Sequence, residues 1–304
     1  MPPSMPRISL GPSGPDISRL VYGVWRLADS ADTSVAATLR KIHACLDQGI
    51  TTFDHADIYG DYRCEQLFGD ALKTAPALAA RLQTVTKCGI MLKSGVYPQR
   101  RVKHYDTSAA HIRASVDASL SHIGVEVIDL LLLHRPDPFM DHSDTGRCLD
   151  QLVASGKVRA VGVSNFQPWD SDLLQSAMQT PLASNQIEIS LLAQSALTDG
   201  QIAYLQRKAI TPMAWSPLAG GALFGDGAAA QRVRPALQRL ANQFGVGLDA
   251  VAVAWLLAHP AGIVPVLGTN DLGRLQALGD AFKVQIDRET WFELATLAAG
   301  AEVP

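Results

Sequence analysis

The 304-residue sequence has little charge and few aromatic residues: 18% of its residues are charged, 6% are aromatic and 47% are hydrophobic. This composition is typical of a chain that buries a large apolar core, and it excludes a disordered or fibrous protein. The net charge is only −3, with Lys and Arg spread along the chain, so the sequence lacks the basic face of a nucleic-acid-binding protein. We therefore expect no nucleic-acid partner.

Patterns that hold metals or form redox pairs are also missing. The four cysteines, Cys45, Cys64, Cys88 and Cys148, lie far apart, and no C-x-x-C, H-x-H or H-E-x-x-H sequence occurs. We expect no metal site, and a reduced, cytoplasmic protein is the simplest account of this cysteine usage.

No uninterrupted apolar stretch is long enough for a membrane span. Residues 1–16 are rich in Pro, Gly and Ser and lack the apolar region of a secretory signal. The most apolar stretch, residues 250–268, is interrupted by His259-Pro260 and by Pro265, which predicts a buried helix followed by a strand. We expect no membrane partner.

Short apolar, β-branched runs recur along the whole chain and alternate with helical patterns. The eight candidate strands are residues 20–25, 51–54, 83–87, 127–134, 158–163, 183–187, 211–216 and 263–267. Strands that are apolar on both faces and alternate with helices predict a parallel sheet covered by helices, and eight such units predict a (β/α)8 TIM barrel. We expect one domain over residues 1–304, without an internal linker.

The helical patterns and the two ends of the chain complete this prediction. Ile112, Val116, Leu120 and Ile123 have helical spacing, with Asp106 or Thr107 as the expected N-cap and Gly124 just past the end. Residues 7–18 predict a hairpin that closes the bottom of the barrel, and residues 287–299 predict an extra C-terminal helix. Two long connections, 88–107 and 216–231, are expected to cover or build a site.

Three of the predicted strands deliver an ionisable residue at their C-terminal ends. Asp54 ends the second strand, Lys87 the third and His134 the fourth, while Tyr59 follows Asp54 by five residues. Active sites of (β/α)8 barrels lie at this end of the strands. These four residues are therefore the candidate catalytic group, although each alone has a structural explanation.

Further motifs surround these residues. Asp54-His55-Ala56-Asp57-Ile58-Tyr59-Gly60 is followed by Glu65, and later strands carry Gly162-Val163-Ser164-Asn165-Phe166, Asn185-Gln186 and Trp215-Ser216-Pro217-Leu218. With these motifs the chain resembles the aldo-keto reductase family over nearly its whole length. It looks most similar to the bacterial YdhF-type branch, in the potassium-channel β-subunit-like group. His55 stands where the family usually has Thr, and Trp215 where it usually has Tyr.

The resemblance implies reversible reduction of an aldehyde or ketone to an alcohol, with hydride from a nicotinamide. A free phenol has a pKa near ~10, so Tyr59 needs the neighbouring Lys87 ammonium to lower its pKa before it donates the proton. Asp54 would hold Lys87 in place. His134 would orient the carbonyl with a hydrogen bond.

The resemblance also assigns binding residues. NADP is expected, with NAD as the alternative, because Arg274 suits a phosphate. The expected cofactor residues are Ser164, Asn165 and Gln186 at the carboxamide, Trp215 on the nicotinamide ring, Ser216, Leu218 and Gly220 in the following turn, and Gly268, Thr269 and Arg274 at the adenosine phosphate. Trp25, Tyr97 and Tyr105 are expected to contact a small-molecule carbonyl substrate. Its identity, the oligomeric state and the preferred direction of reaction are not specified by these patterns.

Two other functions and one misleading motif bear on this interpretation. Lys87 could instead form a Schiff base, as in barrel aldolases, or the same residues could serve a nicotinamide-binding sensor subunit with slow turnover. The stretch 245–250 matches the dinucleotide pattern G-x-G-x-x-G/A. It follows a helical run instead of a strand, so we interpret it as the end of a helix and a turn.

Overall fold

The computed structural model describes residues 5–12 and 14–303. Residues 1–4 and 304 of the expected domain, and Ser13 in the expected hairpin, lie outside this part. The eight predicted strands are all present and form a closed barrel of parallel strands in the order β10-β11-β12-β3-β4-β5-β8-β9. Their bounds are β3 (Val21–Gly23), β4 (Thr52–Asp54), β5 (Gln83–Cys88), β8 (Ile128–Leu133), β9 (Val158–Ser164), β10 (Ser184–Glu188), β11 (Thr211–Trp215) and β12 (Val264–Leu267). The chain is thus a single (β/α)8 domain.

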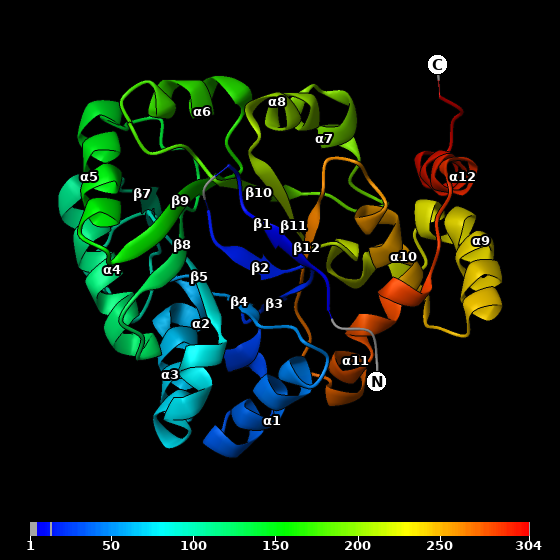
Figure 1. The fold of residues 1–304 in the computed structure, drawn as a ribbon, viewed down its shortest axis with the longest axis horizontal. Coiled ribbons are helices and arrows are strands. Elements are labelled where there is room, and N and C mark those ends of the chain that lie inside the picture. Colours follow the sequence, from blue (N-terminus) through cyan, green and yellow to red (C-terminus); the bar gives the residue numbers. More distant parts are fainter. Residues whose placement is uncertain (1–4, 13, 304) are drawn as a thin grey trace.

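Helices surround the barrel, as Figure 1 shows. The α-helices are α1 (Val35–Leu46), α2 (Tyr59–Tyr62), α3 (Cys64–Thr74), α4 (Ala109–Ile123), α5 (His142–Ala154), α6 (Pro168–Gln175), α7 (Ser195–Thr198), α8 (Gln201–Lys208), α9 (Ala228–Phe244), α10 (Leu248–Leu257), α11 (Leu272–Gln276) and α12 (Arg288–Ala299). Short 3-10 helices are η1 (Leu27–Asp29), η2 (Pro76–Arg81), η3 (Ala219–Phe224) and η4 (Leu278–Lys283).

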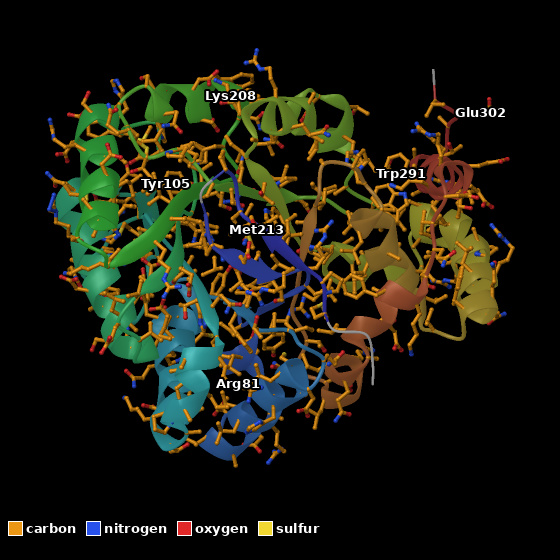
Figure 2. All side chains as sticks on the ribbon, viewed as in Figure 1. Arg81, Tyr105, Lys208, Met213, Trp291 and Glu302 are labelled. Atoms are coloured by element: carbon orange, nitrogen blue, oxygen red, sulfur yellow. The ribbon has the colours of Figure 1, made fainter. Side chains whose placement is uncertain are left out.

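The predicted hairpin closes one end of the barrel. Strands β1 (Arg7–Ser9) and β2 (Asp16–Ser18) pair in antiparallel fashion, and Figure 1 shows them in front of the barrel strands. Leu10 and Ile17 are fully buried in the cluster that fills the barrel interior, together with Met213, which Figure 2 labels near the barrel centre. The hairpin does not cover the opposite end, where the strands have their C-termini, and we call that end the open end of the barrel.

Two larger apolar clusters lie between the barrel and its helices. The helix predicted around Ile112 and Ile123 ends at Gly124, whose φ of 77° is the left-handed conformation expected after a helix. Its N-cap is Ser108, not Asp106 or Thr107, because the Ser108 side chain accepts a hydrogen bond from the backbone N–H of His111. The predicted C-terminal helix is present as α12, with Asp287 as its N-cap.

The two long connections are partly ordered by secondary structure of their own. The first contains a two-stranded hairpin, β6 (Ile90–Met91) with β7 (His104–Tyr105). The second contains η3 and ends earlier than expected, because α9 begins at Ala228. The stretch 245–250 is a helix end and turn as predicted, since Gly245 caps α9 and Gly247 precedes α10.

One further result concerns membranes. Within residues 5–12 and 14–303, no single helix is long and apolar enough to cross a membrane; α9 and α10, bent by 94°, pass that test only when combined.

Candidate active site

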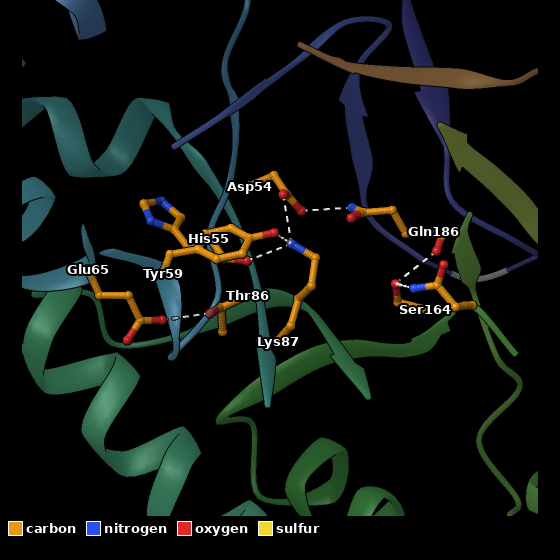
Figure 3. Close-up of polar contacts among 9 residues, drawn as sticks. Asp54, His55, Tyr59, Glu65, Thr86, Lys87, Ser164 and Gln186 are labelled. Atoms are coloured by element: carbon orange, nitrogen blue, oxygen red, sulfur yellow. Dashed lines mark hydrogen bonds and ion pairs between the residues drawn. The ribbon is translucent and has the colours of Figure 1, made fainter. Parts of the chain in front are cut away.

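The candidate site is built around the ammonium group of Lys87, which β5 brings to the open end of the barrel. Lys87 Nζ donates to Asp54 Oδ2 at 2.7 Å, to the backbone oxygen of His55 at 2.8 Å and to the Tyr59 hydroxyl at 3.0 Å. Figure 3 shows Lys87 between these three acceptors. All three ammonium protons are therefore used, and Lys87 is 1% exposed. This arrangement fixes the phenol oxygen of Tyr59 against a buried cation.

The charge state of Lys87 follows from these neighbours. Burial lowers its pKa, but the Asp54 carboxylate and the Tyr59 phenol more than offset burial, so the net pKa is raised. A Schiff-base lysine needs a neutral amine and thus a lowered pKa. With all three N–H groups of Lys87 donated and its pKa raised, the site favours a charged lysine over the neutral amine of the aldolase-like alternative.

The pKa of Tyr59 differs from the expectation that Lys87 would lower it below its usual value. Burial raises this pKa, and the opposing effect of Lys87 is smaller, so the net pKa lies above 10.0. Lys87 still favours the phenolate compared with a site that lacks the ammonium. The phenol is consequently protonated at neutral pH, as a proton donor must be.

His134 lies beside Tyr59, with the two ring centroids 5.8 Å apart and the rings nearly perpendicular. Burial, followed by the charges of Lys87 and Arg135, lowers the His134 pKa well below 6.5. The imidazole is therefore neutral near pH 7. Its Nδ1 is buried without a hydrogen-bond partner within the described residues. The structure thus brings all four candidate catalytic residues together.

Of the expected carboxamide residues, Ser164 ends β9, Asn165 follows it and Gln186 is the third residue of β10. Ser164 Oγ donates to the Gln186 backbone oxygen at 2.8 Å, and Asn165 Nδ2 donates to Ser164 Oγ at 2.8 Å. Gln186 Nε2 donates to Asp54 Oδ1 at 2.8 Å (Figure 3). That contact between an expected cofactor residue and an expected catalytic residue was not predicted from the sequence.

Trp215 and the turn after β11 lie on the same end of the barrel. The Trp215 indole N–H donates to Asn165 Oδ1 at 2.9 Å, which fixes the ring. Ser216 has a positive φ of 48°, and Leu218 precedes the 3-10 turn η3. Gly220 has a φ of 63° and no atom within 4 Å of where a Cβ would stand, so the backbone there is open to a ligand.

The loop after β12 carries the expected phosphate residues. Gly268 and Arg274 are exposed, and Thr269 is half-buried. The Arg274 side chain has no hydrogen-bond or ion-pair partner within the described residues, so its guanidinium is free to bind an anion. Lys41 of α1 reaches the same loop, where its Nζ donates to Asn270 Oδ1 at 3.1 Å and to Ser30 Oγ at 3.0 Å. These donors and cations fit the amide and phosphate groups of a nicotinamide dinucleotide.

The three expected substrate residues have different surroundings. Trp25 lies two residues past β3 and is 56% exposed. Tyr105 belongs to β7 and is half-buried. The Tyr97 ring is nearly perpendicular to that of Tyr62, with the ring centroids 4.7 Å apart, and the Arg100 guanidinium carbon lies 3.7 Å from the Tyr97 centroid.

A second set of buried polar groups lies behind the catalytic ones and was not predicted as a set. Glu65 accepts from the Thr86 hydroxyl at 2.6 Å and from the Ser119 hydroxyl at 3.0 Å. Burial raises the pKa of Asp57 to about 7, with help from the charge of Glu65. Burial lowers the pKa of His55 to about 4, and both of its ring nitrogens are buried without partners within the described residues. The only sequence signal was the motif in which these residues occur.

A polar cavity of about 390 Å³ lies at the plugged end of the barrel, next to the hairpin. Arg159 Nη1 forms an ion pair with Asp129 Oδ1 at 3.1 Å. Arg7 donates to the Thr51 hydroxyl at 3.1 Å and to the Asp16 backbone oxygen at 2.6 Å. The described residues hold no group of three or more His, Cys, Asp or Glu side chains arranged for a metal ion.

The closed parallel barrel and its Tyr–Lys–Asp group at the strand ends define a (β/α)8-barrel oxidoreductase. Residues 19–299 match the model of the Aldo/keto reductase family, and the chain belongs to that family. The family binds nicotinamide cofactors.

Individual relatives agree with this assignment. The chain is 58% identical to a 6-dehydroglucose reductase of Agrobacterium fabrum over 288 residues, covering 95% of this chain and 96% of the relative. It is 42% identical to the oxidoreductase YdhF of Escherichia coli over 299 residues, covering 98% and 99%, so the similarity to the YdhF-type branch is confirmed. A solved structure of a glycerol dehydrogenase from Gluconobacter oxydans superimposes with a TM-score of 0.84 at 26% identity, covering 97% of this chain and 95% of that one.

Proposed function

We propose that the protein catalyses the NADPH-dependent reduction of a sugar aldehyde of the 6-dehydroglucose type to the corresponding alcohol. The observation that carries the proposal is the 3.0 Å hydrogen bond from Lys87 Nζ to the Tyr59 hydroxyl, in a buried site where Asp54 keeps Lys87 charged. The proposed substrate follows from the relative with 58% identity over nearly the full length of both chains.

Each site residue has a separate role in the reduction. The cofactor, when bound, supplies the hydride. Tyr59 donates the proton to the carbonyl oxygen as negative charge develops there, and the Lys87 ammonium stabilises the phenolate that remains. His134, as a neutral imidazole, donates a hydrogen bond that orients the carbonyl. Ser164, Asn165 and Gln186 bind the nicotinamide carboxamide through their amide and hydroxyl groups.

The adenosine end sets the preference for NADPH. Arg274 offers the planar fork of donors that matches a phosphate, and the Thr269 hydroxyl lies in the same loop. Lys41 adds positive charge beneath this loop. At the substrate end, the exposed ring of Trp25 suits the C–H face of a sugar, while Tyr105 contributes a half-buried wall.

The proposal is tested by substituting the proton donor. In Tyr59→Phe, we expect reduction of 6-dehydroglucose and of glyceraldehyde to fall at least about a hundredfold, because the general acid is lost. NADPH binding, followed by nicotinamide fluorescence, should be retained. Tyr204→Phe is the matched control, because the Tyr204 hydroxyl bonds Asp172 at 2.7 Å on α8 and α6, outside the site. Near-normal reduction by Tyr59→Phe would show that Tyr59 is not the acid. Wild-type reduction of glyceraldehyde but not 6-dehydroglucose would refute the proposed substrate.

A further inference from the structure

The short element α2, which begins at Tyr59, is not a regular right-handed helix. Three consecutive residues are left-handed: Gly60 with φ 59°, Asp61 with φ 56° and Tyr62 with φ 66°. L-residues adopt this conformation singly and seldom in a row, and for a bulky residue such as Tyr it is a true outlier. Such a conformation persists only where its surroundings hold it.

One side of this left-handed turn is packed against its neighbours. A Cβ at Gly60 would lie 2.5 Å from Ala28 Cβ and 2.7 Å from Cys64 Sγ, so no side chain fits there. Arg63 Nε also donates to the Gly60 backbone oxygen at 2.9 Å. The start of the turn therefore has no room to shift in that direction.

The other side of the turn is held by the connection between β5 and α4. The Tyr62 hydroxyl accepts from Arg100 Nη1 at 2.6 Å and from the Leu92 backbone N–H at 3.0 Å. The rings of Tyr97 and Tyr62 are nearly perpendicular with their centroids 4.7 Å apart, and the Arg100 guanidinium carbon lies 3.7 Å from the centre of the Tyr97 ring. We call Tyr62, Leu92, Tyr97 and Arg100 the Tyr62 clasp.

The clasp acts on a turn that is bonded to the candidate proton donor. The Arg63 backbone N–H donates to the Tyr59 backbone oxygen at 3.1 Å, and the Tyr62 N–H donates to that of Ile58 at 3.4 Å. If the turn relaxed toward right-handed conformations, the Tyr59 backbone would move with it. The phenol would then leave its position 3.0 Å from Lys87 Nζ.

We propose that the Tyr62 clasp is a positioning device: it holds the left-handed turn and thereby keeps the Tyr59 hydroxyl on Lys87. Tyr62 and Arg100 are positioning residues that act through Tyr59, and the inference rests on the proposed role of Tyr59 as the proton donor. Proton donation then requires that the connection between β5 and α4, which carries the rest of the clasp, keeps its conformation.

The test cuts the clasp without removing its rings. Tyr62→Phe deletes only the phenol oxygen, and Arg100→Met deletes the guanidinium but keeps much of the stem. We expect each to lower kcat for glyceraldehyde with NADPH by about tenfold, because small misplacements of reacting groups cost one to two orders of magnitude. The NADPH Kd should not change. The loss of kcat in the double variant should be clearly smaller than the product of the two single losses, because both substitutions remove the Arg100–Tyr62 hydrogen bond.

A rescue experiment separates positioning from general damage. Asp61 is exposed and its side chain has no hydrogen-bond or ion-pair partner in the described part of the chain, so Asp61→Gly removes no such contact and makes the left-handed conformation easier to adopt. Asp61→Gly in the Tyr62→Phe background should recover most of the lost kcat. If the double variant stays as slow as Tyr62→Phe, or if Tyr62→Phe has the wild-type kcat, the clasp does not position Tyr59.

Amide hydrogen exchange provides a readout that does not depend on turnover. In Tyr62→Phe, peptides covering residues 57–64 should exchange faster than in the wild type, whereas Tyr204→Phe should leave them unchanged. If these peptides exchange in Tyr62→Phe at the wild-type rate, the clasp does not hold the turn, whatever the activity of the variant. If exchange is faster in Tyr62→Phe but the wild-type protein reduces no aldehyde, the proposed function is refuted, while the role of the clasp in holding the turn is supported.

Discussion

Gln186 and Asp54 are joined across the mouth of the barrel, from β10 and β4, which lie on opposite sides of the closed sheet. Gln186 Nε2 donates to Asp54 Oδ1 at 2.8 Å, while the other carboxylate oxygen accepts from Lys87 at 2.7 Å. Both residues are 2% exposed. A residue expected to bind the cofactor thus also satisfies the carboxylate that holds Lys87.

We predict that Gln186→Met lowers both activity and stability. Without the amide, Asp54 Oδ1 is buried without a donor, which costs about 1–3 kcal/mol, and the nicotinamide loses a polar partner. Steady-state kinetics and thermal unfolding measure the two effects. Gln201→Met is the control, because buried Gln201 donates to the Phe166 backbone oxygen at 3.0 Å, away from Lys87. Equal losses of kcat in the two variants would contradict a special role for Gln186.

Breaking the buried ion pair should separate stability from chemistry. Lys87→Met leaves the Asp54 carboxylate buried and unpaired, for which we expect a loss of about 3–5 kcal/mol in the free energy of unfolding, together with loss of reduction. In Lys87→Met/Asp54→Leu, both charges are gone, so most of the stability should return while activity stays absent. Chemical denaturation measures the free energies. A double variant as unstable as the single one would show that packing, not charge, dominates this site.

The sequence predicted the parts of the molecule that depend on local pattern. Eight apolar runs indicated the barrel. Three of them end in Asp54, Lys87 and His134, and because parallel strands bring their C-terminal residues to one edge, these residues indicated the end where the active site lies. The predicted N-cap of α4 was wrong by one or two residues. Asp106 and Ser108 are both good N-cap residues, and the backbone conformation decides which of them caps the helix.

Contacts between residues far apart in the sequence were not predictable in this way. The bond between Gln186 and Asp54 spans 132 positions. The left-handed turn at Asp61 and Tyr62 has no local signal beyond Gly60. The lowered pKa predicted for Tyr59 was also wrong in its net direction, because burial raises this pKa and depends on packing that no motif encodes.

Cofactor preference should change with the charge in the loop after β12. We expect Arg274→Leu to raise the NADPH Kd by roughly tenfold or more, in keeping with the ~1.5–3 kcal/mol of a hydrogen bond to a charged group, with little change for NADH. Gly268→Lys should strengthen NADPH binding. A Cβ there would lie 3.2 Å from the Gly23 backbone oxygen, so a small shift is needed. Fluorescence titrations with both cofactors measure the ratio, and equal changes for NADPH and NADH would refute a phosphate site.

The free energy of unfolding should depend on pH through the buried groups of Asp57 and His55. The folded pKa of Asp57 is about 7 against 3.8 in its unfolded state, so unfolded chains release this proton first and stability falls as pH rises from about 4 to 7. The folded pKa of His55 is about 4 against 6.5, so unfolded chains take up a proton first and stability falls as pH decreases from about 6.5 to 4. The two contributions oppose each other over that range.

Substituting either residue should therefore reveal the pH dependence of stability that the other residue causes. Relative to wild type, Asp57→Asn should gain stability progressively from pH 4 to pH 7, by up to about 4 kcal/mol at ~1.4 kcal/mol for each unit of pKa. His55→Thr should show the reverse trend, gaining relative stability from pH 6.5 to pH 4 by up to about 3 kcal/mol on the same basis, whatever constant cost its cavity adds. Urea unfolding at several pH values gives these slopes. Because cavity and packing effects do not vary with pH, a pH-independent difference in both variants would show that neither group has the shifted pKa that its buried position implies.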